Sequence, residues 1–83
     1  DDMTNNDISV YPNPGRGIYT ISGDLPLNRY RLMNLKGQIL QTGSFLNNPI
    51  GKAELDLSNH PPGIYLLGIE TERVFQTHRL LIR

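Results

Sequence analysis

Short β-rich runs separated by turn residues recur along almost the whole chain, and no stretch keeps a helical period over about ten residues. Prolines and glycines fall in the gaps, where they would break a helix. This spacing is typical of an antiparallel sandwich or barrel. We therefore predict an all-β fold, an Ig-like antiparallel β-sandwich of about seven strands in two sheets. The expected strands are Ile8–Tyr11, Ile18–Ser22, Arg29–Asn34, Gln38–Phe45, Ala53–Leu57, Gly63–Glu70 and Val74–Ile82.

Apolar and polar residues alternate in most of these runs, which predicts strands with one buried face. Tyr19 and Ile21 fall on one side of their strand, as Leu55 and Leu57 do on theirs. The segment Gly63–Glu70 is apolar at successive positions instead. It is therefore expected to be a central strand with cover on both faces.

Two of the gaps are short enough to close hairpins. They are Asn34-Leu35-Lys36-Gly37 and Glu70-Thr71-Glu72-Arg73, and Gly37 supplies the positive φ that such a loop needs. We expect the third strand to pair with the fourth, and the sixth with the seventh.

Composition excludes several classes of function. Eight Lys and Arg residues balance eight Asp and Glu residues, so no global charge attracts nucleic acid. The chain has no cysteine, which removes disulfides, thiolate zinc sites and cysteine nucleophiles.

The 83 residues fit one domain. Residues 1–7 have nothing to bury and are expected to be a linker from a preceding part of a longer chain, with the folded domain over 8–83.

No group of residues predicts catalysis or a bound metal or cofactor. His60 stands in a turn, and His78 stands in the last strand at what we expect to be an outward polar position. No third ligand lies at a diagnostic spacing from either histidine. Asp24 and the pair Asp1-Asp2 lack the dense oxygen pattern of a calcium loop. We expect no catalytic residue, no metal, no cofactor and no enzyme activity.

The tyrosines raise the possibility of a sugar-binding platform. Tyr19, Tyr30 and Tyr65 alternate inside apolar strands, which favours core packing with the hydroxyl at the rim. Only Tyr11 and Phe45 are expected to be exposed. A carbohydrate-binding accessory module of a secreted enzyme and an Ig-like or fibronectin-like spacer remain as alternatives.

Pro12-Asn13-Pro14 directly follows the first strand. The first proline removes a ladder donor, the residue before Pro14 is restricted to extended geometry, and Pro14 fixes the exit toward Gly15 and Gly17. We predict a rigid corner at which the chain leaves the sheet.

Several motifs follow this corner in a fixed order: "x-Leu-x-Asn-x-x-Gly" at the first hairpin, "x-Leu-Asp-Leu-Ser" at the fifth strand, Pro-Gly-Ile-Tyr-Leu-Leu at the sixth and a basic-aliphatic last strand. Together with Val-Tyr-Pro-Asn-Pro, they resemble the C-terminal sorting domain of proteins exported by the bacterial type IX secretion system, in its type A form. The resemblance spans Ile8 to Arg83.

The resemblance assigns two groups of residues. Departures from the family pattern are Asn34, where aspartate is frequent, and His60, where an aliphatic residue is frequent. The family's signature falls on Tyr11, Pro12, Asn13, Pro14, Gly17, Gly37, Gly63 and Tyr65, and its terminal recognition segment on Arg79, Leu80, Leu81, Ile82 and Arg83.

The family's function implies a secretion signal for an N-terminal cargo domain. In a Gram-negative bacterium, the cargo crosses the periplasm, and the type IX translocon and outer-membrane shuttle proteins recognise the domain. A sortase-like peptidase commonly cuts ahead of it, and the cargo is attached to the surface or released. The last strand is expected to dock by strand addition, with Arg79 and Arg83 giving orientation while Leu80 and Ile82 hold the strand to its own core. A strand-exchanged dimer is a further possibility.

Overall fold

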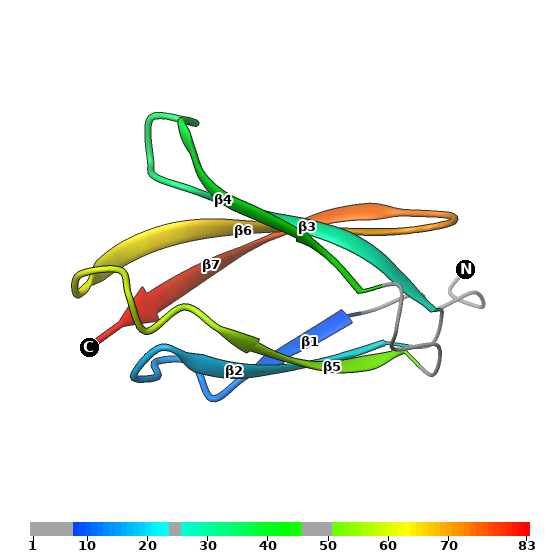
Figure 1. The fold of residues 1–83 in the computed structure, drawn as a ribbon, viewed down its shortest axis with the longest axis horizontal. Helices are drawn as coiled ribbons and strands as arrows, with labels where there is room; N and C mark the ends of the chain where they lie inside the picture. The colour runs from blue at the N-terminus through cyan, green and yellow to red at the C-terminus, as the bar shows by residue number, and fades with distance from the viewer. Residues whose placement is uncertain (1–7, 24–25, 46–50) are drawn as a thin grey trace.

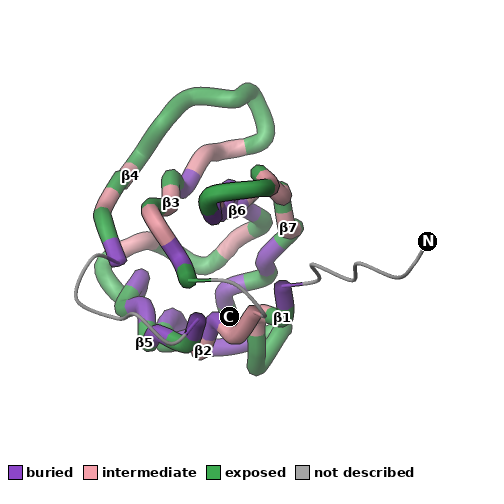
Figure 2. Tube along the Cα trace, turned by 90° about the vertical axis from the view of Figure 1, so that its right-hand side faces the viewer, coloured by how far each residue is buried: buried purple, intermediate pink, exposed green. Residues whose placement is uncertain are grey.

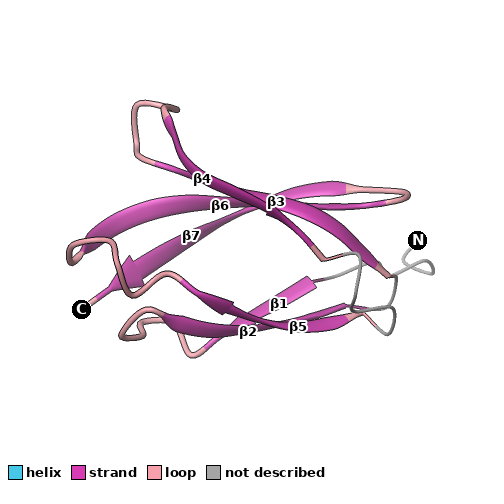
Figure 3. Cartoon of the chain, viewed as in Figure 1, coloured by secondary structure: helices cyan, strands magenta, loops and turns pink. Residues whose placement is uncertain are grey.

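The strands form two antiparallel sheets that face each other. The computed structural model describes residues 8–23, 26–45 and 51–83. One sheet has the order β1-β2-β5 and the other the order β4-β3-β6-β7 (Figures 1 and 3). This arrangement confirms the predicted all-β sandwich. The strands are β1 (Ile8–Tyr11), β2 (Ile18–Gly23), β3 (Leu27–Met33), β4 (Ile39–Ser44), β5 (Lys52–Asp56), β6 (Gly63–Thr71) and β7 (Phe75–Ile82).

Each expected strand coincides with an observed one, and its ends shift by no more than two residues. The predicted pairings are also confirmed, because β3 pairs with β4 and β6 pairs with β7. Strand β6 lies between β3 and β7, so it is central to the larger sheet as predicted.

The core lies between the sheets and is built from the inward residues of both (Figure 2). Because strand side chains alternate with period two, β2, β5 and β6 contribute alternate residues to it, whereas β4 contributes none and is followed by the buried Phe45. Burial of this apolar surface is the main stabilising contribution in a domain without disulfides. The fully buried large side chains are Tyr19, Ile21, Leu32, Leu57, Leu67, Ile69 and Leu80.

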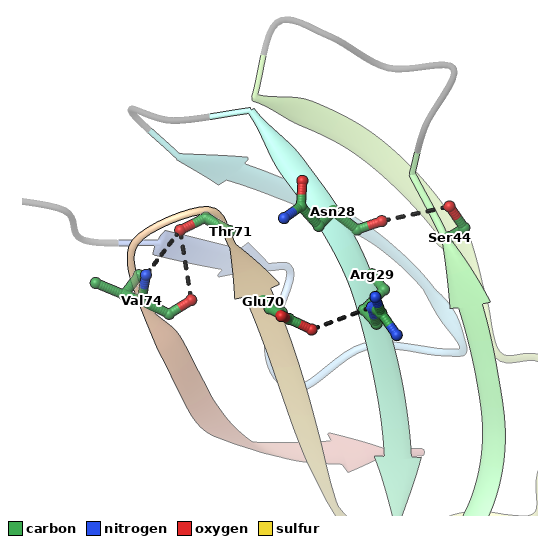
Figure 4. A network of polar contacts seen from close by, with 6 residues as sticks. All are labelled: Asn28, Arg29, Ser44, Glu70, Thr71 and Val74. Carbon is green, nitrogen blue, oxygen red and sulfur yellow. Dashed lines mark hydrogen bonds and ion pairs between the residues drawn. The ribbon is translucent and has the colours of Figure 1, made fainter.

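Both predicted hairpin loops are closed by a polar side chain. Asn34 Oδ1 accepts hydrogen bonds from the amides of Lys36 at 2.9 Å and Gln38 at 3.0 Å, and Gly37 has φ +86°. Asn34 therefore bonds two turn amides through its side-chain oxygen. In the β6–β7 loop, the buried Thr71 Oγ1 accepts from the amide of Val74 at 3.1 Å (Figure 4).

The outer face of the four-stranded sheet corrects one expectation. Strand β6 was predicted to have cover on both faces, yet no described element packs over its outer side (Figure 1). Ile64 is 44% exposed there, and Leu66 is half-buried. The continuous apolar character of β6 therefore reflects one buried face and one apolar surface.

No helix long and apolar enough to span a membrane occurs in the described part of the chain. The expected linker 1–7 and Asp24 lie outside the described residues.

Candidate functional site at the end of strand β7

The end of β7 is hydrogen-bonded to the loop that follows β1. Strand β7 is an edge strand of the larger sheet. Along its second half, the Gly15 amide donates to Leu81 O at 3.0 Å, and the Arg83 amide donates to Gly15 O at 2.8 Å. Gly15 and Ile82 form a parallel bridge. The first loop thus joins the edge of the opposite sheet.

The Asn13 side chain extends this pairing by one step. Its Nδ2 donates to Arg79 O at 2.8 Å, and its Oδ1 accepts from the Leu81 amide at 3.1 Å. A side-chain amide carries one donor group and one acceptor group, so it pairs with a strand edge as a backbone peptide would. Both peptide bonds that precede the prolines, Tyr11-Pro12 and Asn13-Pro14, are cis. The two hydrogen bonds of its side chain place Asn13 along the edge of β7.

Tyr19 adds a third contact from the core side. Its side chain is fully buried, and its hydroxyl donates to Leu81 O at 2.9 Å. Burial raises the pKa of Tyr19, with a smaller opposite effect from the Gly15 backbone. The hydroxyl therefore stays protonated and remains a donor. We call the set Asn13, Gly15, Tyr19 and Arg79–Arg83 the terminal junction.

Gly15 is required where it stands because a side chain would not fit. A Cβ on Gly15 would lie 2.8 Å from Pro12 O and 2.8 Å from the Tyr19 ring. The sequence did not predict the contacts of Gly15 and of the Tyr19 hydroxyl with the last strand. The only local signal was a glycine directly after the second proline.

Gly17 connects the same loop to the residue that directly follows β5. Its φ is +113°, and its carbonyl accepts from the Leu57 amide at 2.6 Å. A Cβ on Gly17 would lie 2.6 Å from Ser58 Cα, which is a backbone atom. Both the positive φ and the close backbone therefore exclude other residues.

The terminal segment divides its side chains as expected. Leu80 and Ile82 are buried in the core, whereas Arg79, Leu81 and Arg83 are exposed. The expectation that a partner strand adds to this edge is corrected. Asn13 and Gly15 already form hydrogen bonds with the N–H and C=O groups of Leu81. A partner strand cannot add to this part of the edge without displacing the first loop.

A hollow of about 350 Å³ adjoins the terminal junction. It is lined by Asn13, Pro14, Ile64, Arg79 and Leu81. Arg79 therefore takes part in a depression that is built from both the first loop and the larger sheet.

The remaining signature residues lie away from the first loop. Gly37 is in the β3–β4 hairpin. Gly63 begins β6, and Tyr65 is buried with its hydroxyl donating to Pro61 O. Gly63 and Tyr65 pair across the larger sheet with Ile82 and Leu80 of the terminal segment. The signature therefore meets this segment from two sides, through β6 and through Asn13 of the first loop.

His60 is not the solvated loop residue that the sequence suggested. It is half-buried, its Nε2 lies 2.7 Å from Gln41 Oε1, and its ring centre lies 6.0 Å from that of Tyr65. The imidazole therefore packs at the corner where the family often has an aliphatic residue. No group of three or more possible metal ligands occurs among the described residues.

His78 was expected to point outward, and this was wrong. It occupies the side of β7 that Leu80 shares, and it is half-buried. Its Nε2 lies 3.1 Å from Gln76 Oε1. Burial lowers the pKa of His78 below its ordinary value of 6.5. Leu80 and Ile82 thus decide which side of β7 faces the core. His78 and Gln76 lie on that same inner side because side chains alternate along a strand.

This lowered pKa predicts a loss of stability in mild acid. The folded protein favours the neutral imidazole, whereas the unfolded chain takes up a proton near pH 6.5. The free energy of unfolding should therefore fall as the pH drops below about 6.5, and level off below the folded pKa. Thermal unfolding from about pH 7 to pH 5 should show a smaller fall for His78→Gln than for the original chain. An equal loss of stability in the two proteins would show that His78 does not contribute to the pH dependence.

The aromatic residues do not form the platform that sugar binding needs. Tyr11 is exposed as expected, but Phe45 is 4% exposed, with its ring centre 5.3 Å from that of Tyr30. The prediction of an exposed Phe45 was wrong because this residue, directly after β4, is buried in the core beside Tyr30. Tyr19, Tyr30 and Tyr65 pack inward with bonded hydroxyls, as predicted.

Comparison with known proteins identifies the chain's family. A family model described as the secretion system C-terminal sorting domain matches residues 9–83. No curated protein matches the chain. The match covers nearly all of the sequence and includes both the first loop and the terminal segment. The chain therefore belongs to the family of type IX secretion C-terminal sorting domains.

Proposed function

We propose that this domain carries an N-terminal cargo to the type IX outer-membrane translocon and that the terminal junction is the surface that the machinery reads. Membership of the family makes this domain a sorting signal of a secreted or cell-surface protein. The observation that supports the terminal junction as the recognition surface is the contact between the first loop and the terminal segment. Asn13 bonds to Arg79 and Leu81, which are 66 and 68 residues away.

The geometry favours recognition through side chains. Arg79, Leu81 and Arg83 project from a strand whose backbone is held on one side by β6 and on the other by the first loop. A partner therefore meets two exposed arginines and one exposed aliphatic side chain on a backbone that is held in place. Cationic groups at the edge of an apolar contact steer and orient a partner more than they add affinity.

Other steps of the proposal follow the family. Residues 1–7 serve as the linker from the cargo, and a sortase-like peptidase cuts ahead of the domain. The cargo passes through the periplasm and reaches the surface, where it is attached or released. Shuttle proteins of the outer membrane collect the domain. An exchange of β7 between two copies would preserve the terminal junction with Asn13 of the second copy, which supports testing for a dimer.

Export of a reporter tests the proposal. The whole chain, fused behind a periplasmic fluorescent protein, should bring the reporter to the surface or medium in cells with the type IX machinery. The same fusion should stay periplasmic in cells without it. An Ig-like spacer or a carbohydrate-binding module would leave the reporter in the periplasm of both strains.

Replacing both Arg79 and Arg83 with serine should block export and leave the melting temperature unchanged. Both side chains are exposed, and exposed substitutions alter stability by only about 0.5 kcal/mol. The matched control replaces Lys36 and Arg73 with serine, since these exposed cations lie in hairpin loops away from the terminal junction. Normal export of the Arg79→Ser, Arg83→Ser protein would refute the assignment of the recognition surface.

A further inference from the structure

A second surface lies on the outer face of the four-stranded sheet. It is a groove of about 750 Å³, which is within the range of about 300–1,000 Å³ typical of ligand sites. Arg29, Arg31, Ile39, Glu70 and Phe75 are among its lining residues. Ile39 is 52% exposed and Phe75 is 49% exposed, so the groove combines charge with open apolar surface.

Three strands hold the centre of this groove together. Phe75 on β7 folds its ring over Gly68 on β6, where an added Cβ would lie 2.7 Å from the ring. The guanidinium carbon of Arg31 on β3 lies 5.0 Å from the centre of the same ring. Gly68 therefore makes room for the aromatic ring, and the ring supports the cation.

The two arginines of β3 differ in their partners. Arg29 Nε lies 3.1 Å from Glu70 Oε1, so its charge is already matched within the sheet (Figure 4). Arg31 is exposed and pairs with no carboxylate among the residues that the structure describes. The cation–π contact with Phe75 restricts the guanidinium of Arg31, and no ion pair with a described residue uses its N–H groups. This is the arrangement in which arginine binds a carboxylate through two parallel hydrogen bonds.

The charges of the two outer faces point to an acidic occupant. The groove on the four-stranded sheet is lined by Arg29 and Arg31 against Glu70, whereas β5 on the other sheet exposes Lys52 against Glu54 and Asp56. The chain as a whole has no net charge, so the positive character is a local property of the groove face. Opposite charge across a contact steers association and fixes its register.

We propose that this groove binds an extended acidic segment of a partner protein. A carboxylate of the segment pairs with Arg31, and a neighbouring apolar side chain packs on Phe75 and Ile39. This surface lies at the Phe75 end of β7, while the terminal junction lies at the Ile82 end. The inference goes beyond the proposed sorting function and does not depend on it.

Peptide titration into the whole chain tests this site. The probe is a short peptide of alternating glutamate and leucine, and its matched controls carry glutamine or lysine in place of glutamate. The acidic peptide should bind, shift the amide resonances around Arg31, Gly68 and Phe75, and lose affinity as salt is raised. The glutamine and lysine peptides should bind at least about tenfold more weakly.

Variants locate the contact. Arg31→Gln should weaken the acidic peptide about tenfold or more, because one charge-assisted pair is lost. Arg31→Lys keeps the charge without the planar fork and should bind at an intermediate level. Lys52→Gln, on the other sheet, should leave binding within about twofold. Unchanged melting temperatures show that each variant is folded.

Three results would overturn the proposal. The first is equal binding of the glutamate and glutamine peptides, and the second is full affinity in Arg31→Gln. The third is binding of inorganic polyphosphate or of vesicles of anionic phospholipid at this face while the acidic peptide fails to bind. Because binding is measured with purified components, each result is independent of whether a reporter is exported.

Discussion

Gly17→Ala should remove about 2–5 kcal/mol of stability, which combines about 1–2 kcal/mol for a left-handed backbone with about 1–3 kcal/mol for overpacking. The two causes act together at this position because φ is +113° and a Cβ would lie 2.6 Å from Ser58 Cα. A domain of this size has a total stability of about 4–12 kcal/mol. The variant should therefore lose a large share of its folded population. Urea unfolding at constant m-value measures the change.

Gly37→Ala is the matched control. Gly37 also has a positive φ, +86°, but no atom lies within 4 Å of the position that a Cβ would occupy. Only the backbone cost remains, about 1–2 kcal/mol. Equal losses at Gly17 and Gly37 would show that the contact with Ser58 relaxes without cost, and that the first loop tolerates a side chain.

Leu80→Ala should destabilise the domain by about 2–5 kcal/mol, because it removes a fully buried side chain and leaves a cavity. Leu81→Ala, one residue further along β7, should cost less than about 1 kcal/mol, since Leu81 is 39% exposed. On the proposed function, both variants lose export, but for different reasons. The Leu80 variant loses the fold, whereas the Leu81 variant loses a side chain that the partner contacts.

Unfolding in urea and reporter export distinguish the two cases. Export of Leu81→Ala at the original level would exclude this side chain from the recognition surface. Export of Leu80→Ala at the original level, together with the expected loss of stability, would show that the machinery does not require the folded last strand.

Sequence predicted the strands of this fold because their local signals are strong. Period-two alternation in Tyr19-Thr20-Ile21 and the glycine at position 37 each depend on neighbouring residues alone. What a strand packs against depends on distant residues. The outward prediction for His78 failed because its strand carries apolar side chains on both faces, at Leu80 and Leu81. The exposed prediction for Phe45 failed because burial at a strand end depends on the partner ring of Tyr30.

The terminal junction was predictable only in its parts. Pro-Asn-Pro predicts a rigid corner from steric restrictions, and the last strand is evident from its aliphatic residues. Nothing within either segment shows that Asn13 bonds to Arg79. The contact needs the two sheets to be stacked first. The resemblance to a family grouped both segments as functional, but it supplied neither their contact nor the contributions of Gly15 and Tyr19.

The distance along the chain between Asn13 and Arg79 has a consequence for synthesis. A ribosome adds Asn13 to the growing polypeptide 66 residues before Arg79, so the corner waits without its bonding partners while the rest of the domain is translated. The groups of Asn13 and Gly15 that bond to β7 exchange water for protein partners only when residues 79–83 are present. A product shortened by these few residues would lack every hydrogen bond that Asn13 and Gly15 make to β7. The full set of hydrogen bonds between the first loop and β7 therefore forms only after Arg83 has been translated.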